Sequence, residues 1–267
     1  MDLNVQEIGL LDDDEIELDL AALELSRLDH EGIDPEPYHA LLEEIAARLN
    51  EVGHAAHSPA ARGEALARVL HGDFGFTGDA ENYDAPLNTD MIRVLDRRRG
   101  LPVSLSILYV AAARRMGWSA YALNTPGHVL VRIGDEPAIL IDPFHDGEPV
   151  SNEQFSAFLI NALGPGAPPQ PEHSAAMSNR MVLVRLLLNQ ASRAEHSGDP
   201  VRAVALYTRM TRVAPENPDG WWELARLQLQ LQDINAARHS LTAMLEVTRD
   251  AERRRLAAAA LDAIASG

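Results

Sequence analysis

The chain contains neither cysteine nor lysine among its 267 residues. The absence of cysteine excludes disulfides, zinc sites built on thiolates and catalysis by a thiol. Because arginine supplies all 23 basic side chains, no lysine is present to form a Schiff base or to act as an amine acceptor. No apolar run is long enough to span a bilayer, and the N-terminus has no features of a secretory signal. We therefore expect a cytoplasmic protein with no membrane partner.

Acidic side chains are concentrated at the start of the chain. The net charge is −17, and residues 1–50 contain fifteen aspartates and glutamates against two arginines. Such a surface repels phosphate backbones, so we expect no nucleic-acid partner. The run Asp12-Asp13-Asp14-Glu15 is too charged to pack, and we therefore expect residues 1–16 to form a flexible acidic segment.

The following part of the chain changes its hydrophobic period from helical to strand-like. Helical spacing predicts helices over residues 16–28, 36–52, 59–71, 91–96 and 103–116. Alternation then predicts strands over residues 120–123, 128–133 and 138–141. The Gly-, Asp- and Asn-rich stretch 72–88 is expected to be a loop. Helices followed by antiparallel strands indicate an α+β domain, to which we assign residues 17–163.

A linker and a helical repeat follow. Residues 164–173 are rich in proline and glycine, and we assign them as a linker. Within residues 174–267, three residue types recur 34 positions later, which is the tetratricopeptide period. The recurring pairs are Asp199 and Asp233, Ala203 and Ala237, and Met210 and Met244. We expect an all-α domain of two repeats and a capping helix at 251–264, with a concave surface for a protein or peptide partner.

Three short motifs occur in a fixed order within the α+β domain. They are Gly100-Leu101-Pro102, Gly127-His128 and Ile141-Asp142-Pro143. This order resembles the core of the transglutaminase-like fold, in which a Gly-x-Cys opens a helix, a His opens a strand and an Asp-Pro closes the next strand. Counted back from Gly117 without gaps, the cysteine position is occupied by Pro102, which suits the first turn of a helix but offers no nucleophile.

Residues 82–147 also resemble, more narrowly, the SirB-type family of bacterial proteins. The resemblance is carried by Asn82-Tyr83-Asp84, Asn88, the run 94–106, Asn124-Thr125-Pro126-Gly127-His128 and Ile141-Asp142-Pro143-Phe144. It implies a transglutaminase-like domain followed by tetratricopeptide repeats, with Pro-x-Ser in place of the enzymes' cysteine. It implies no substrate. His145-Asp146-Gly147 departs from the Asn or Gly residues of the family pattern.

The candidate catalytic residues are Ser104, His128 and Asp142. In transglutaminase-like enzymes a thiolate at a helix N-terminus is activated by a His that an Asp orients, and Ser104 would replace the thiol. Each residue also has a purely structural interpretation. Ser104 suits a helix N-cap or a hydroxyl turned into the first helical turn, and His128 suits a loop residue bonded to the backbone. Asp142 suits a turn that ends a strand.

The sequence patterns for a metal site or for other binding residues are weaker. His128, Asp142, His145 and Asp146 offer nitrogen and oxygen ligands, but their spacing fits no strong metal motif, so we expect no metal and no other cofactor. The residues expected to contribute to binding are Asn82, Tyr83, Arg97, Pro102, Tyr207, Trp221 and Trp222. Among them, Tyr207 and Trp221 take aromatic positions of the repeats.

Two functions are consistent with these patterns. A non-catalytic, vestigial transglutaminase-like protein would act as an interaction module through its helical repeats, and the missing thiol favours this hypothesis. The alternative is a serine-dependent hydrolase or acyl-transfer enzyme that uses Ser104, His128 and Asp142 as a triad. The order of the His and the Asp favours this alternative. We expect the interaction module.

Overall fold

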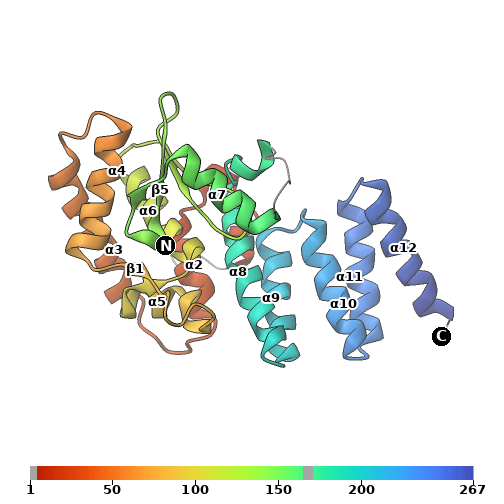
Figure 1. The fold of residues 1–267 in the computed structure, drawn as a ribbon. Coiled ribbons are helices and arrows are strands. Elements are labelled where there is room, and N and C mark those ends of the chain that lie inside the picture. The colour runs from red at the N-terminus through yellow and green to blue at the C-terminus, as the bar shows by residue number, and fades with distance from the viewer. Residues whose placement is uncertain (1–4, 165–170, 267) are drawn as a thin grey trace. The chain divides into compact units, whose positions relative to one another are not determined.

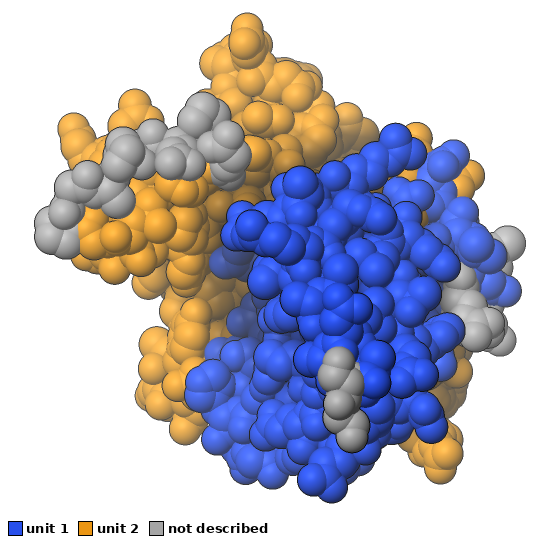
Figure 2. Space-filling view, turned by 90° about the vertical axis from the view of Figure 1, so that its right-hand side faces the viewer, with its two compact units in different colours: residues 1–12, 183–267 blue, residues 13–182 orange. Residues whose placement is uncertain are grey.

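The computed structural model describes residues 5–164 and 171–266, which Figure 1 draws in colour. It contains two compact units, shown in Figure 2: residues 13–182, and residues 1–12 together with residues 183–267. The domain boundaries expected on either side of 164–173 stay a prediction, and residues 165–170 of that linker lie outside the described residues. The second unit therefore combines the two ends of the chain.

The unit 13–182 is built around one buried helix, α6 (Pro102–Arg115), which is buried at every position from Pro102 to Ala113. A helix that is apolar on all sides needs packing partners on all sides. Helices α2, α3 and α4 pack against it. The helices that precede α6 are α2 (Leu18–Arg27), α3 (Glu36–Gly53), α4 (Pro59–Ala67), the π-helical turn η2 (Arg68–Asp73) and α5 (Met91–Arg97). They match the predicted helices, with ends that differ by a few residues.

A four-stranded antiparallel sheet also packs against α6. Its strands lie in chain order: β3 (Ala120–Ala122), β4 (Val131–Ile133), β5 (Ile139–Asp142) and β6 (Glu148–Pro149). The register places Ala120 opposite Ile133 and Val131 opposite Ile141, and all four residues are buried. Helices with a small antiparallel sheet make up the α+β fold that the sequence predicts.

The strand predicted to begin at His128 begins later, at Val131. Gly127 has a φ of +72°, and the His128 N–H donates to the Thr125 carbonyl at 3.2 Å. This turn keeps His128 out of the sheet, because a positive φ interrupts extended backbone. The histidine therefore belongs to the loop that leads into β4.

The stretch 72–88 is more ordered than the loop we expected. Thr77–Gly78 (β1) pairs in parallel with Arg99–Gly100 (β2), and Pro86–Asn88 (η3) forms a 3₁₀ turn. Strands of two residues are too short to give a hydrophobic period, so the pattern could not reveal them. Their pairing fixes the stretch beside the start of α6.

Two residues of the predicted acidic segment 1–16, Asp13 and Ile16, make specific contacts in the structure. Asp13 begins the turn η1 (Asp13–Glu15), and its carboxylate accepts hydrogen bonds from the N–H groups of Asn179 (2.9 Å) and Arg180 (2.8 Å). These N–H groups lie in the first turn of α8, where a helix leaves its donors unpaired. Ile16 is buried as well. A capping role and apolar residues outside the charged run hold this segment in place.

The unit of residues 1–12 and 183–267 contains the repeats. Its helices are α1 (Val5–Ile8), α8 (Asn179–His196, whose first residues belong to the other unit), α9 (Pro200–Val213), α10 (Pro218–Gln230), α11 (Ile234–Val247) and α12 (Ala251–Ser266). Asp199 caps α9 and Asp233 caps α11 through the same backbone contact, to the N–H three residues later. Ala203 and Ala237 are both fully buried. The 34-residue period is thus a structural period too.

One further helix, α7 (Asn152–Leu163), is largely exposed. Ser151 and Gln154 form a capping box at its start, and Leu159 is its buried residue. Within residues 5–164 and 171–266, no helix is both long and apolar enough to cross a membrane.

Candidate functional site

Ser104 lies fully buried in the first turn of α6, where its hydroxyl bonds to the backbone. The Ser104 oxygen accepts the Leu101 N–H at 3.0 Å, and the hydroxyl lies within donating distance of the carbonyls of Asn88 (2.7 Å) and Leu101 (3.0 Å). None of its hydrogen bonds goes to His128. Its single proton is directed at carbonyl oxygens, which are not bases strong enough to take it.

Gly100 leaves the space that this hydroxyl occupies. A Cβ at position 100 would lie 2.7 Å from the Ser104 oxygen, closer than real contacts allow. The Gly100-Leu101-Pro102 motif therefore serves the packing of Ser104. Pro102 is the first residue of α6 and is buried there, as expected for a proline whose missing N–H would have no helical partner.

Ser104 is one end of a buried polar network formed by Asp79, Asn88, Arg97 and Ser104. The Arg97 guanidinium donates to Asp79 (2.7 Å) and to the Asn88 side-chain oxygen (3.0 Å). Asp79 also accepts the Asn82 N–H (3.1 Å), and Asp79 and Asn88 are fully buried. The two predicted binding residues Asn82 and Arg97 thus hold the loop before α5.

The charge of Asp79 is balanced inside this network. Burial raises the pKa of its carboxyl, but the hydrogen bonds from Arg97 and from the Asn82 N–H lower it, and the net pKa lies below 3.8. A carboxylate with a lowered pKa that is bonded to an arginine stays ionised under ordinary conditions. This part of the motif is therefore a charged anchor for the loop.

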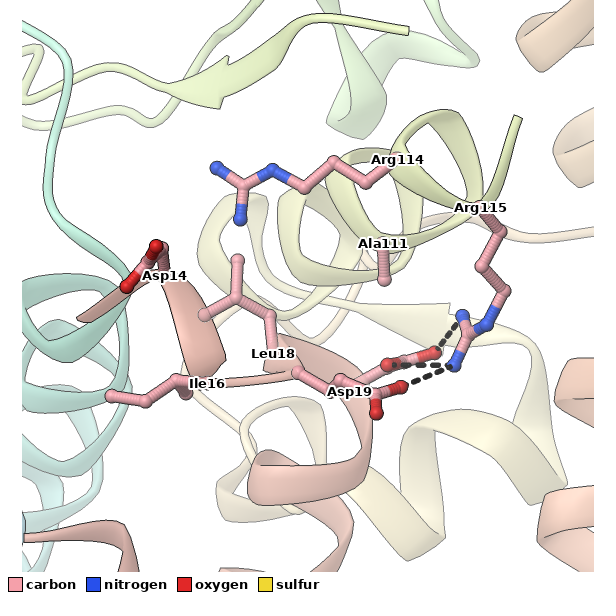
Figure 3. A pocket seen from close by; sticks show the side chains of 8 residues that line it. Asp14, Ile16, Leu18, Asp19, Ala111, Arg114 and Arg115 are labelled. Carbon is pink, nitrogen blue, oxygen red and sulfur yellow. Dashed lines mark hydrogen bonds and ion pairs between the residues drawn. The ribbon is translucent and has the colours of Figure 1, made fainter. Parts of the chain in front are cut away.

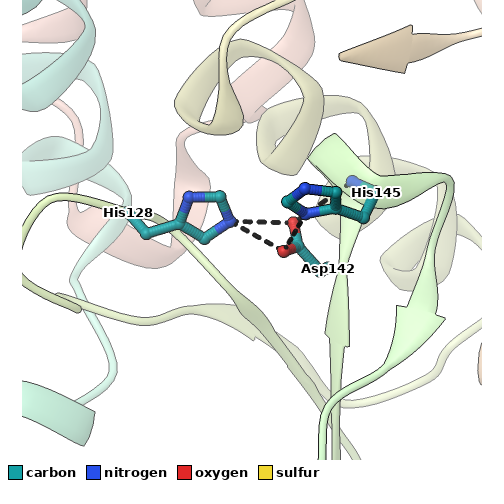
Figure 4. A group of neighbouring side chains, drawn as sticks. All are labelled: His128, Asp142 and His145. Carbon is teal, nitrogen blue, oxygen red and sulfur yellow. Dashed lines mark hydrogen bonds and ion pairs between the residues drawn. The ribbon is translucent and has the colours of Figure 1, made fainter. Parts of the chain in front are cut away.

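His128, Asp142 and His145 form a second group, which we call the histidine–carboxylate cluster (Figure 4). The His128 Nε2 lies 2.9 Å from each oxygen of Asp142, and the His145 Nδ1 lies 2.7 Å from Asp142 Oδ2. Asp142 ends β5 and His145 ends the turn η4 (Pro143–His145), so the Asp-Pro motif places both side chains. The structure brings His128 and Asp142 together, and it adds His145 instead of Ser104.

Backbone and burial fix the carboxylate at the centre of the cluster. Asp142 is 2% exposed, and its Oδ1 accepts the N–H groups of Phe144 (3.0 Å) and His145 (3.4 Å). Burial raises the pKa of Asp142, but the bonds from His128 and His145 outweigh it and leave the pKa below 3.8. The carboxylate is therefore ionised, and in the described residues its side-chain partners are the two imidazoles.

Aromatic rings surround His128. Phe158 of α7 stacks on it with 4.9 Å between ring centroids and 6° between planes, and Phe144 meets its edge at 6.0 Å. Tyr83, a predicted binding residue, is half-exposed and packs against Phe144. These contacts orient the imidazole and give it an apolar wall. Phe158 carried no signal in the sequence, because none of the motifs extends into α7.

The predicted binding residues of the repeats lie within the repeat packing. Tyr207 is buried and its hydroxyl donates to Glu195 at 2.8 Å, and Glu195 also binds Arg226. Burial and the neighbouring Glu195 raise the pKa of Tyr207. Trp221 donates to the Pro215 carbonyl (2.8 Å). Trp221 and Trp222 are partly buried against a hydrophobic cluster of Ala225, Leu241, Met244 and Ala257. Their roles in partner binding stay a prediction.

A separate pocket of about 220 Å³ lies in the unit 13–182 (Figure 3). It is lined by Asp14, Ile16, Glu17, Leu18, Asp19, Ala111, Arg114 and Arg115. Arg115 pairs with Asp19 and Glu17, and Arg114 donates to Asn179 and to the Ala120 carbonyl. Its charges are thus bonded within the protein, and no predicted site residue lines it.

Comparison with known proteins decides the family. The sequence matches the family model of the transglutaminase-like superfamily over residues 36–188, more than half of the chain. The chain belongs to the transglutaminase-like superfamily. A tetratricopeptide-repeat model matches residues 194–261. The transglutaminase-like domain followed by repeats, predicted from the motifs, is confirmed.

Bacterial relatives match this transglutaminase-like protein over different shares of its length. A UPF0162 protein of Xylella fastidiosa (strain 9a5c) is 29% identical over 246 residues, 90% of this chain and 87% of the relative. A UPF0162 protein of Vibrio cholerae serotype O1 is 34% identical over 130 residues, 48% of this chain and 47% of the relative. A crystal structure of menin, 14% identical, covers 95% of this chain and 73% of menin with a TM-score of 0.39, a likeness too weak to bear on function.

Proposed function

We propose that this transglutaminase-like protein is a cytoplasmic interaction module that binds protein partners through its repeats, and that it performs no serine-dependent catalysis. Tetratricopeptide repeats generally mediate contacts between proteins, which supports the first part. The second part rests on one observation, the hydroxyl of Ser104 bonded to the backbone of Leu101 and Asn88.

The chemistry of serine explains why this observation matters. A serine hydroxyl becomes a nucleophile only when a base lies within hydrogen-bond reach of its proton. Ser104 is 0% exposed and bonds to carbonyls, whereas the imidazole of His128 bonds to Asp142. Turning the hydroxyl away would take its proton from the carbonyls of Asn88 and Leu101, at a cost of about 0.5–1.5 kcal/mol.

A covalent probe tests the catalytic half of this proposal without knowledge of a substrate. The protein is incubated with a fluorophosphonate, which modifies activated serines, and its intact mass is measured. A known serine hydrolase in the same reaction confirms that the probe is active. We expect no adduct on this chain. An adduct that disappears in Ser104→Ala would show that Ser104 is a nucleophile and would overturn the proposal.

The repeat surface supplies the test of partner binding. Leu188 on α8 is 42% exposed and lies 34 residues before Trp222, so the two side chains take equivalent positions in the two repeats. Val201 on α9 is 72% exposed and offers a matched apolar control on a second helix of the repeat. We infer that a partner contacts the Leu188–Trp222 face.

The corresponding experiment is crosslinking in the bacterium followed by mass spectrometry of the captured proteins. Wild type, His128→Ala and Val201→Glu are expected to capture the same partners, and Leu188→Glu is expected to lose them. Loss in His128→Ala with retention in Leu188→Glu would place the partner on the transglutaminase-like domain and contradict binding through the repeats.

A further inference from the structure

We propose that His128, Asp142 and His145 form a binding site for a divalent transition-metal ion, with zinc as the best-suited ion. One ligand atom from each side chain lies within 4.8 Å of the other two (Figure 4). Within residues 5–164 and 171–266, this is the group of histidine and acidic side chains that brings three such atoms together. The inference departs from our sequence-based expectation of no metal and does not depend on the proposed function.

The donor set determines the class of ion. Two imidazole nitrogens and one carboxylate oxygen suit zinc and its neighbours in the first transition row, whereas magnesium and calcium prefer oxygen alone. Sites with three protein ligands leave at least one coordination position for water or for an incoming group. A water molecule or a small anion would fill that position.

The geometry requires only a small opening of the cluster. Metal–ligand bonds of about 2.0–2.1 Å at tetrahedral angles place ligand atoms roughly 3.4 Å apart. The Asp142 oxygens now lie 2.9 Å from the His128 nitrogen and 2.7 Å from the His145 nitrogen. The His145 side chain is 58% exposed, so its ring has room to move outward. The His128 ring must also move about half an ångström away from Asp142.

The other two ligands are oriented by their neighbours. The backbone N–H groups of Phe144 and His145 fix the Asp142 carboxylate, and Phe158 stacks on the His128 ring. Such outer contacts orient metal ligands and strengthen binding. No arginine is among the partners of Asp142 in the described part of the chain, so a bound cation would have no competitor with a permanent charge.

Binding would exchange protons within the rings. A carboxylate only accepts hydrogen bonds, so His128 Nε2 and His145 Nδ1 both carry the proton in the arrangement described. An ion takes the lone pair of an unprotonated nitrogen, so each neutral ring would move its proton to its other nitrogen. No oxidant, reductant or third group is needed for this step.

The test uses the full chain without a histidine tag, stripped of metal with EDTA and titrated with zinc chloride by calorimetry. We expect one zinc ion per chain with a dissociation constant in the micromolar range or below. His145→Asn and Asp142→Asn are expected to weaken binding by about 10- to 100-fold or more. His71→Asn is the matched control, because His71 lies 3.1 Å from Asp146 but, among the described residues, no third histidine or acidic side chain joins the pair. This variant is expected to bind zinc like wild type.

Cobalt provides a second measurement, since Co²⁺ bound by imidazoles in a distorted tetrahedral site absorbs visible light. The absorption should appear in wild type and His71→Asn and be lost in His145→Asn. Thermal unfolding of each variant confirms that it is folded. Zinc should raise the unfolding midpoint of wild type and His71→Asn, and it should leave that of His145→Asn unchanged. The proposal fails if wild type binds zinc no better than millimolar, or if His145→Asn binds it as tightly as wild type.

Discussion

The buried polar network and the histidine–carboxylate cluster lie in the same domain and in the same region of motifs. They differ in the partners of their hydrogen bonds and in their exposure to solvent. The network of Asp79, Asn88, Arg97 and Ser104 directs its polar groups at one another and at the backbone. The cluster places two imidazoles around one buried carboxylate, and one of those imidazoles, that of His145, is largely exposed.

This difference shows that motif residues of one family do not share one role. The saturated network fixes the loop before α5, so its residues are needed for the fold. The cluster keeps one imidazole, that of His145, at the surface beside the buried Asp142, so this group is accessible for chemistry. A catalytic role for Ser104 stays a prediction, and the hydrogen bonds of its hydroxyl in the structure go to the backbone of Asn88 and Leu101.

The largest effect is expected from breaking the network at Arg97. Arg97→Met leaves the Asp79 charge buried without its partner, and the free energy of unfolding should fall by about 2–4 kcal/mol. This loss is measured by urea unfolding, with Trp118 fluorescence as the signal in a protein whose Trp221 and Trp222 are replaced by Phe. Arg93→Met, on the same helix and paired with exposed Asp96, should cost less than about 0.5 kcal/mol. Equal losses in both would contradict a special role for the network.

The second-largest loss of stability is expected from replacing Asp142, the central carboxylate of the cluster, and this loss should depend on pH. Asp142→Asn should lower stability by about 1–3 kcal/mol at pH 7. Because the folded pKa of Asp142 lies below 3.8, its carboxylate stabilises the fold above that pH and loses its effect as the pH falls through the folded pKa. Urea unfolding at pH 7, 5 and 3.5 should show the gap to wild type narrowing at the lowest pH. A gap that widens on acidification would contradict the lowered pKa.

Filling the space beside Ser104 should have a smaller effect. A methyl group in Gly100→Ala would press on the Ser104 oxygen and destabilise by about 1–2 kcal/mol. Adding Ser104→Ala removes the clash, so the double variant should lose less than the sum of the single losses. Gly72→Ala, with nothing near its added carbon, is the control and should stay within about 0.5 kcal/mol of wild type. Strict additivity would show that the two residues do not compete for space.

The smallest effect is expected at the exposed edge of the cluster. His145→Asn, measured in metal-free buffer by the same urea titration, should change stability by less than about 0.5 kcal/mol. Its side chain is mostly solvated, so little burial is lost. A loss well above about 1 kcal/mol would place His145 among the structural residues, as in the network, and would remove the distinction drawn between the two groups.

The sequence predicted the elements that have a clear period. The helices over 36–52, 59–71 and 103–116 and the 34-residue repeat correspond to long apolar patterns, which are the most informative signals. The order of Gly100, His128 and Asp142 was sufficient for the family. The two-residue strands β1 and β2 were missed because such short strands carry no pattern.

The direction of a side chain could not be predicted in the same way. The partner of the Ser104 hydroxyl is a carbonyl sixteen residues earlier in the chain, and the ring on His128 comes from α7. Such contacts depend on how loops fold over one another, which local spacing does not encode. His145 was the exception, because its position just after the Asp-Pro motif made it visible as a departure from the family pattern.

The position of α1 has a consequence for biosynthesis. Val5 and Ile8 are buried in a helix that packs against α9, and α9 begins only at Pro200. During synthesis this turn must therefore wait until residues 9–213 have been made, with its apolar side chains exposed or held by a chaperone. Chains that terminate before α9 would keep this hydrophobic turn uncovered, and proteases would recognise them by it.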